Sequence, residues 1–316
     1  MPIRARPPFA MMLVTLALIA CDQPREPARS DTAAVVAPPP PDTTPAPVRR
    51  PAWAVRAGPV LVVRDSASVG GALVILPLAG ESAIPDSARG HLSVVDGATL
   101  DLFNVRGSAG KGVVADVLET DAGDACGPWM AATVRPAGGD TASGDWTVAF
   151  APGRVRPVPL YPVEMMPTAD SARLAAEVTR LASALPDSPA SPFRGLPFRV
   201  RTAHRFSAAP GVVAVAADLV RKVPQEAMPL EEHTLLVAER DSADAEARFR
   251  DVYHDRRSAT EERVVTNEVL ASVRVGTPGR TSLVLALIGY DSISYAMLER
   301  SPAGRWRMRW VSGRGC

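Results

Sequence analysis

Leu283-Val284-Leu285-Ala286-Leu287-Ile288 is a run of six residues without a polar side chain. Successive side chains of a β-strand point to opposite faces of the sheet, so a strand of this composition presents apolar groups on both sides. We therefore expect this run to form a central strand that is covered on both faces. The rest of the second half of the chain is expected to pack around it.

A β-hairpin is expected directly after this strand, formed by Ile293–Arg300 and Arg305–Val311. The residues between them, Ser301-Pro302-Ala303-Gly304, have Pro and Gly at the positions that a type I turn prefers. If Arg300 pairs with Arg305, the apolar side chains of the two strands lie opposite one another. The second strand alternates tryptophan or methionine with arginine, so it has one apolar and one basic face.

Short runs rich in Val and Leu, separated by Gly, Pro, Asp and Ser, recur along the rest of the chain, which is typical of an all-β protein. We predict a mainly β fold of antiparallel sheets, sandwich-like or barrel-like, with an α+β fold as the alternative. The expected strands are Val60–Arg64, Ala72–Pro77, His91–Val95, Thr99–Val105, Gly112–Leu118, Met130–Arg135, Trp146–Ala151, Phe198–Phe206, Gly211–Val223, His233–Arg240, Arg248–His254 and Glu268–Val275.

One amphipathic helix is expected. Leu174, Val178, Leu181 and Leu185 recur at helical spacing, and Pro186 ends the pattern. The start of the helix is predicted to be capped by a side chain, from Thr168 or Asp170. Because its polar face is not rich in Lys or Arg, we expect this helix to pack on a sheet and not on a membrane surface.

The amino terminus has the pattern of a secretory signal. Two arginines precede the uncharged apolar run Phe9–Ala20, and small residues lie where a signal peptide is cut. A membrane-spanning helix would need about 20 apolar residues, and this run is shorter.

The tetrapeptide Leu18-Ile19-Ala20-Cys21 resembles the lipobox of bacterial lipoproteins, and the resemblance covers residues 1–22 only. It implies removal of residues 1–20, a diacylglycerol on the Cys21 thiol and, usually, acylation of the new amino group. Two or three acyl chains hold a protein stably at a bilayer. The protein is then expected in the cell envelope, on the periplasmic side of the inner membrane or on the outer membrane. The alternative is an ordinary cleaved signal followed by a coincidental cysteine.

The two remaining cysteines, Cys126 and Cys316, are expected to form a disulfide, because disulfides persist in exported proteins. The alternative is two separate thiols.

Composition suggests how the chain is divided. Residues 21–51 are rich in Pro and poor in large apolar residues, so after the anchor we expect a disordered linker. A β sub-domain is expected at 52–165, the helix and a Pro-rich connector at 166–197, and a second β sub-domain, a meander, at 198–316. A weak similarity between the segments 61–67 and 236–243 leaves an ancient duplication open.

The charge pattern argues against nucleic acid as a partner. The formal net charge is +1 and aromatic residues make up 5% of the chain, so neither a basic field nor a stacking surface is expected. The arginines that share a face with Arg205 or with Arg305 could together bind anionic lipid or phosphate. The balanced overall charge instead favours two solvated sheet faces.

Three histidines are the candidates for a metal site. His204, His233 and His254 lie on separate expected strands, and a zinc hydrolase needs three converging ligands. His204 alternates onto the same face as Phe206 and Phe198, which favours a half-buried, hydrogen-bonded histidine. His233 is expected to be exposed at the start of its strand.

These observations favour a membrane-anchored envelope lipoprotein that acts as a non-catalytic binding or structural module and needs no cofactor. Its expected partners are the bilayer, through acylated Cys21, and an unknown envelope protein or ligand. Two alternatives remain: a periplasmic metal-assisted hydrolase that uses the three histidines, and a small-ligand carrier with a deep pocket.

Overall fold

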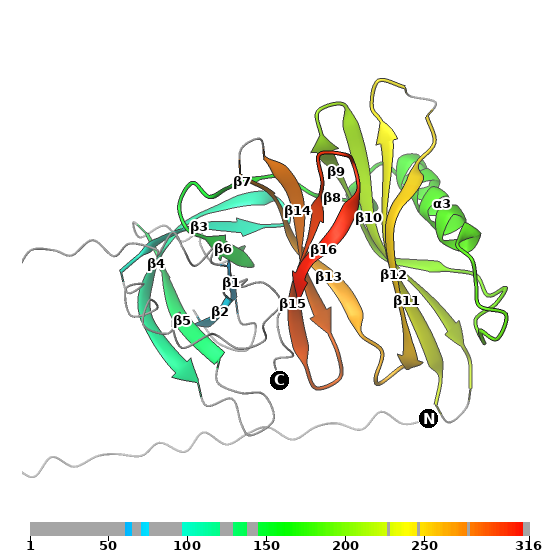
Figure 1. The fold of residues 1–316 in the computed structure, drawn as a ribbon, viewed down its shortest axis with the longest axis horizontal. Coiled ribbons are helices and arrows are strands. Elements are labelled where there is room, and N and C mark those ends of the chain that lie inside the picture. Colours follow the sequence, from blue (N-terminus) through cyan, green and yellow to red (C-terminus); the bar gives the residue numbers. More distant parts are fainter. Residues whose placement is uncertain are drawn as a thin grey trace, which may run out of the picture. The chain divides into compact units, whose positions relative to one another are not determined.

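The computed structural model describes residues 61–64, 71–75, 97–120, 129–137, 145–225, 228–244, 247–276 and 279–311. These residues form three antiparallel sheets and one long helix (Figure 1). The mainly β fold expected from the sequence is confirmed. Within these ranges, no helix has the length and apolar character needed to cross a membrane.

The first sheet is a closed barrel of six short strands in the order β1-β2-β5-β4-β3-β6. Its last strand pairs with both the first and the third, and these two pairings close the ring. The side chains inside are mostly small or branched, with Leu100, Leu102 and Val114 fully buried, and Trp146 is the large exception among them. The strands are β1 (Leu61–Arg64), β2 (Gly71–Ile75), β3 (Thr99–Asn104), β4 (Gly107–Thr120), β5 (Trp129–Pro136) and β6 (Val148–Phe150).

The other two sheets have five strands each, in the orders β12-β11-β10-β9-β8 (the second sheet) and β16-β15-β14-β13-β7 (the third sheet). They pack against each other through one apolar cluster that contains residues of both. Their strands are β7 (Val155–Pro157), β8 (Tyr161–Pro162), β9 (Arg199–Ala209), β10 (Val212–Val223), β11 (Leu230–Asp241), β12 (Arg250–Thr260), β13 (Thr266–Val275), β14 (Arg280–Ile288), β15 (Ile293–Arg300) and β16 (Trp306–Val311).

The apolar run Leu283–Ile288 lies in β14, the middle strand of the third sheet. Leu283 and Leu285 pack toward the second sheet, whereas Val284 and Ala286 belong to a cluster that includes Phe103 and Phe150 of the barrel. The prediction of a central strand covered on both faces is therefore confirmed. The Thr147 hydroxyl adds a polar link to this contact, because it donates a 2.8 Å hydrogen bond to the carbonyl of Leu270 in β13.

The helix α3 (Thr168–Ala184) packs on the outer face of the second sheet. Leu174, Val178 and Leu181 are buried against residues of β10 and β11, as the amphipathic pattern predicted. The prediction of a side-chain cap is wrong. Pro167 occupies the N-cap position and makes no side-chain cap hydrogen bond, and Thr168 is already helical.

The hairpin β15–β16 has the expected turn, in which the Gly304 amide donates a 2.9 Å hydrogen bond to the Ser301 carbonyl. Its register differs by one residue from the expected one, because Arg300 pairs with Trp306 and not with Arg305. A β-bulge later in the hairpin then brings Met297 opposite Trp310.

Two very short strands were not predicted. After the barrel, the chain adds β7 to the edge of the third sheet and β8 to the edge of the second sheet. A short 3-10 helix, Val163–Met165, then leads into α3. This crossing of both sheet edges positions α3 over the second sheet.

Candidate functional site

A β-bulge in β9 decides which of its side chains face α3. The pairing with β10 passes from Thr202 opposite Asp218 to Val200 opposite Leu219, so Arg201 has no partner residue on β10. Such an extra residue reverses the alternation beyond it. Phe198 and Val200 accordingly pack on the helix side, whereas Phe206 packs between the two sheets.

This bulge corrects the prediction that Phe198, His204 and Phe206 share one face. That prediction assumed strict alternation along the whole strand. Alternation holds on each side of Arg201, but the extra residue shifts it by one position. Beyond the bulge, the helix side of β9 carries Arg205.

A cavity of about 440 Å³ lies where α3 meets the second sheet, and we call it the helix cavity. Its volume is in the range of small-molecule sites, about 300–1,000 Å³. The first turns of α3, the strands β9 and β11 and the residues before β12 all contribute side chains. The lining residues are Met166, Asp170, Arg173, Leu174, Glu177, Arg205, Arg240, Ala247, Arg248 and Phe249.

Four arginines face two carboxylates in this cavity, and both carboxylates have partners. Asp170 accepts a 3.0 Å hydrogen bond from Arg173. Glu177 accepts two, of 3.0 and 2.7 Å, from Arg180, which does not line the cavity. The hydrogen bond from Arg180 lowers the pKa of Glu177 despite partial burial, and the charge of Arg248 acts in the same direction. Glu177 is therefore ionised at neutral pH.

Arg205 and Arg248 give the cavity an excess of positive charge. Within the described ranges, neither Arg205 nor Arg248 has a carboxylate at ion-pairing distance. Arg205 is half-buried on β9, and Arg248 is exposed. Arg240 is held against Phe249, with its guanidinium carbon 5.1 Å from the ring centroid, a cation–π arrangement.

The cavity also has apolar lining residues. Leu174 and Phe249 are each 8% exposed, and Met166 is half-buried. A cavity lined by both arginines and apolar side chains suits a ligand that has both an anionic and an apolar part.

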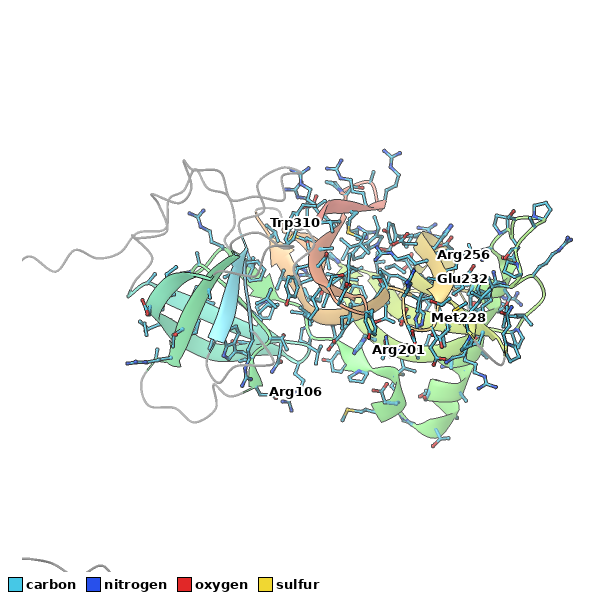
Figure 2. The ribbon with its side chains drawn as sticks, turned by 90° about the horizontal axis from the view of Figure 1, so that it is seen from below. Arg106, Arg201, Met228, Glu232, Arg256 and Trp310 are labelled. Atoms are coloured by element: carbon cyan, nitrogen blue, oxygen red, sulfur yellow. The ribbon has the colours of Figure 1, made fainter. Side chains whose placement is uncertain are left out.

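A second group of charges on the same sheet face is structural. Arg221 donates to Asp187 (2.5 and 3.0 Å) and to Glu232 (2.8 Å), and it stacks on Phe198 with its guanidinium carbon 4.6 Å from the ring centroid. Arg256 also binds Asp187, at 2.9 Å, and lies close to Glu232 in Figure 2. Together these residues fix the segment that follows α3 to the second sheet.

His233 is buried, at 2% exposure, so the expectation that it is exposed is wrong. The strand β11 begins at Leu230, three residues earlier than expected, and it lies inside the sheet between β10 and β12. The two ring nitrogens of His233 lie 3.2 Å from Asp218 Oδ2 and 3.0 Å from Glu231 Oε2. Burial alone would lower the pKa of His233, but the two carboxylates raise it above its ordinary value.

The three candidate histidines do not converge on one site. His204 pairs with Ala216 and His233 with Val220, four residues further along β10, which corresponds to about 13 Å. His254 is opposite Leu236, whose side chain faces α3. In the part of the chain that the structure describes, no group of three His, Cys, Asp or Glu side chains could hold a metal ion.

Each histidine has a separate environment. His254 contacts Asp251 at 2.8 Å near the surface. His204 is half-buried, and burial lowers its pKa, an effect that the charge of Glu164 partly opposes. Its Nδ1 is buried without a hydrogen-bond partner, which differs from the hydrogen-bonded histidine that the sequence favoured.

The residues of the proposed anchor and disulfide, Cys21, Cys126 and Cys316, lie outside the described residues. Their roles stay predictions.

The sequence indicated one member of the helix cavity. Alternation marked Arg205 as part of a basic stripe, but the structure separates this stripe: Arg199 is exposed, Arg201 binds Asp218 at 3.0 Å, and Arg205 lines the cavity. The other cavity arginines were missed, because they come from α3, from the end of β11 and from the residues before β12. No local pattern connects these segments.

Comparisons with protein-family models, with curated proteins and with solved structures find no match for this chain. The site is therefore interpreted from its own residues.

Proposed function

We propose that this protein is a binding module of the bacterial cell envelope, held at a membrane through acylated Cys21, and that it takes a small amphiphilic anion in the helix cavity. The observation that carries the proposal is the charge of that cavity. Four arginines line about 440 Å³, and two of them, Arg205 and Arg248, have no carboxylate at ion-pairing distance among the described residues.

Arginine is suited to this task. Its planar guanidinium donates paired hydrogen bonds to a carboxylate, phosphate or sulfonate, and each charge-assisted bond contributes about 1.5–3 kcal/mol. Arg205 is half-buried, so water screens its charge less than that of a fully exposed side chain. An anion that reaches Arg205 and Arg240 together would place its apolar part on Leu174 and Phe249.

Exposed apolar side chains beside the cavity support an amphiphilic ligand. Met165, next to the lining residue Met166, is 81% exposed. Tyr161, opposite Arg205 in the β8–β9 pair, is 61% exposed. Exposed apolar groups that gather near a cavity are typical of ligand or interaction surfaces.

The envelope location rests on the resemblance of Leu18–Cys21 to the lipobox. A disulfide between Cys126 and Cys316 belongs to the same proposal, because an exported protein folds under oxidising conditions. Mass spectrometry of peptides from non-reduced envelope protein tests that bond. Free thiols at both positions would contradict it.

The fluorescent probe 8-anilinonaphthalene-1-sulfonate tests the cavity, because it combines an anionic group with aromatic rings. We expect saturable fluorescence with the full-length protein in neutral detergent micelles, after subtraction of the micelle signal. The double variant R205Q/R240Q should bind at least tenfold more weakly, since it loses two charge-assisted contacts. Decanoate should compete with the probe.

The matched control is R199Q, which removes an exposed arginine from the same strand, β9. Its affinity for the probe should equal that of the wild type. Circular dichroism should show the same β signal for all three proteins. Equal binding by the wild type and R205Q/R240Q, or no saturable binding by the wild type, would remove the support for the helix cavity as the site.

A further inference from the structure

A second cavity, of about 360 Å³, lies outside the site proposed above and is also rich in arginine. Three hairpins and the strand β7 contribute to it: the β9–β10 turn, the β13–β14 turn and the β15–β16 turn. Four arginines line it, namely Arg156, Arg274, Arg280 and Arg300. We call it the hairpin cavity.

Two of these arginines form an unfavourable pair. Arg156 on β7 and Arg274 on β13 are directly opposite in the antiparallel pairing. Like charges in this position destabilise a sheet. Among the residues with described positions, neither arginine has a carboxylate at ion-pairing distance. The arrangement therefore keeps two positive charges together without a counter-charge from these parts of the chain.

The other two arginines each contact a buried carboxylate. Arg300 donates two hydrogen bonds to Glu239, which is 1% exposed. Arg280 lies 3.3 Å from Glu299, which is 3% exposed. Side chains whose rotamers are fixed by such contacts bind a ligand at a lower entropic cost than free ones.

We infer that the hairpin cavity binds a phosphate group, either of a soluble phosphomonoester or of a phospholipid headgroup. A phosphomonoester carries about two negative charges near neutral pH and would neutralise Arg156 and Arg274 together, whereas a phosphodiester headgroup would neutralise one of them. In both cases the phosphate oxygens suit a group of guanidinium donors. The cavity is in the size range of small-molecule sites, so it has room for the phosphate and part of the group esterified to it. This site is independent of the helix cavity.

The test measures thermal unfolding of the full-length protein in neutral detergent micelles. Inorganic phosphate and glycerol 3-phosphate are titrated at constant ionic strength, with chloride as the reference salt. We expect a saturable rise in Tm with glycerol 3-phosphate, because a ligand that binds only the folded state stabilises it. A second arm uses dihexanoyl phosphatidylglycerol and dihexanoyl phosphatidylcholine as monomers. A shift in Tm with phosphatidylglycerol, and none with glycerol 3-phosphate or inorganic phosphate, identifies a lipid headgroup as the source of the phosphate.

Two variants link the shift to the cavity. R156Q/R274Q should fold, because it removes a like-charge contact, and its affinity for the phosphate probe should fall at least tenfold. R156Q alone changes only an exposed edge residue and should show a smaller loss. R205Q, in the helix cavity, should keep the wild-type response. The inference is overturned if none of the phosphate compounds shifts Tm beyond chloride, or if R156Q/R274Q responds like the wild type.

Discussion

Arg300, in the third sheet, donates hydrogen bonds of 2.7 and 3.0 Å to the carboxylate of Glu239, in the second sheet. The indole of Trp306 donates a third hydrogen bond, of 2.6 Å, to the same carboxylate. Glu239 is buried, at 1% exposure, and these three donors satisfy its carboxylate. The pair therefore fixes the position of one sheet relative to the other.

Replacing Glu239 by Gln should destabilise the protein by about 3–5 kcal/mol, because it leaves Arg300 largely buried without its counter-charge. Urea unfolding measures this change. The exposed pair Arg173–Asp170 provides the control, and D170N should cost less than about 1 kcal/mol. Removing both charges, in E239L/R300M, should recover much of the loss. Equal unfolding midpoints for E239Q and D170N would contradict this account.

The stability of the protein should fall as the pH rises above about 6.5, the ordinary pKa of histidine. The carboxylates of Asp218 and Glu231 raise the pKa of His233 in the folded state, against the effect of burial. The charged ring therefore stabilises the fold fully below its unfolded pKa, and this contribution is lost as the pH rises through the folded pKa. Arg201 and Lys222, which bind the same two carboxylates, stay charged across this range.

Denaturant unfolding at a series of pH values between about 6 and 9 measures this dependence. H233Q should have a flatter profile than the wild type over that window. H254Q, which changes an exposed histidine, should keep the wild-type slope. A slope that is unchanged in H233Q would show that other groups cause it.

Gly112 in the barrel strand β4 should not tolerate alanine. An added Cβ would lie 2.7 Å from Val134 Cγ1 and 3.3 Å from the Arg135 carbonyl, so neighbouring strands would have to move. Overpacking of this kind costs about 1–3 kcal/mol. S108A, at an exposed position of the same strand, is the control and should unfold like the wild type. A stable G112A protein would mean that the barrel can expand at this point.

The membrane anchor predicts a defined mass for the mature protein. Intact-mass measurement should give a chain that starts at Cys21 with added acyl groups, and the protein should float with membranes in a density gradient. C21S should lose the acyl mass, because it has no thiol to carry the diacylglycerol, and any C21S material that lacks residues 1–20 should no longer float with membranes. A mature wild-type chain without acyl mass would leave the ordinary signal peptide as the explanation.

Local composition predicted the elements whose environment is uniform along their length. The run Leu283–Ile288 has no polar residue, so it could only be covered on both faces, and the structure buries it between the second sheet and the barrel. The spacing of Leu174, Val178 and Leu181 fixed the buried side of α3 in the same way. The local pattern of apolar residues was sufficient in both cases, as a continuous run in the strand and as a helical period in α3.

The candidate site depended on features that local composition does not record. The bulge at Arg201 follows from pairing with β10, and it places His204 on the opposite side of the sheet from Phe198. His233 was expected at the surface because it follows two glutamates, yet all three residues are buried through pairing with charged neighbours. The arginines of the helix cavity come from a helix, two strands and a loop, and those of the hairpin cavity from strands and turns that are distant in the sequence.

The three-residue strand β6, with Val148, Ala149 and Phe150 fully buried, completes the barrel by pairing with β1 and β3. Synthesis proceeds from the amino to the carboxyl terminus, so the other five strands of the barrel are made before β6. Until Phe150 has been added, the unfinished ring has two open edges that can pair with another chain. A chaperone that meets the chain at this stage would find a barrel with two unpaired strand edges, which only β6 can cover.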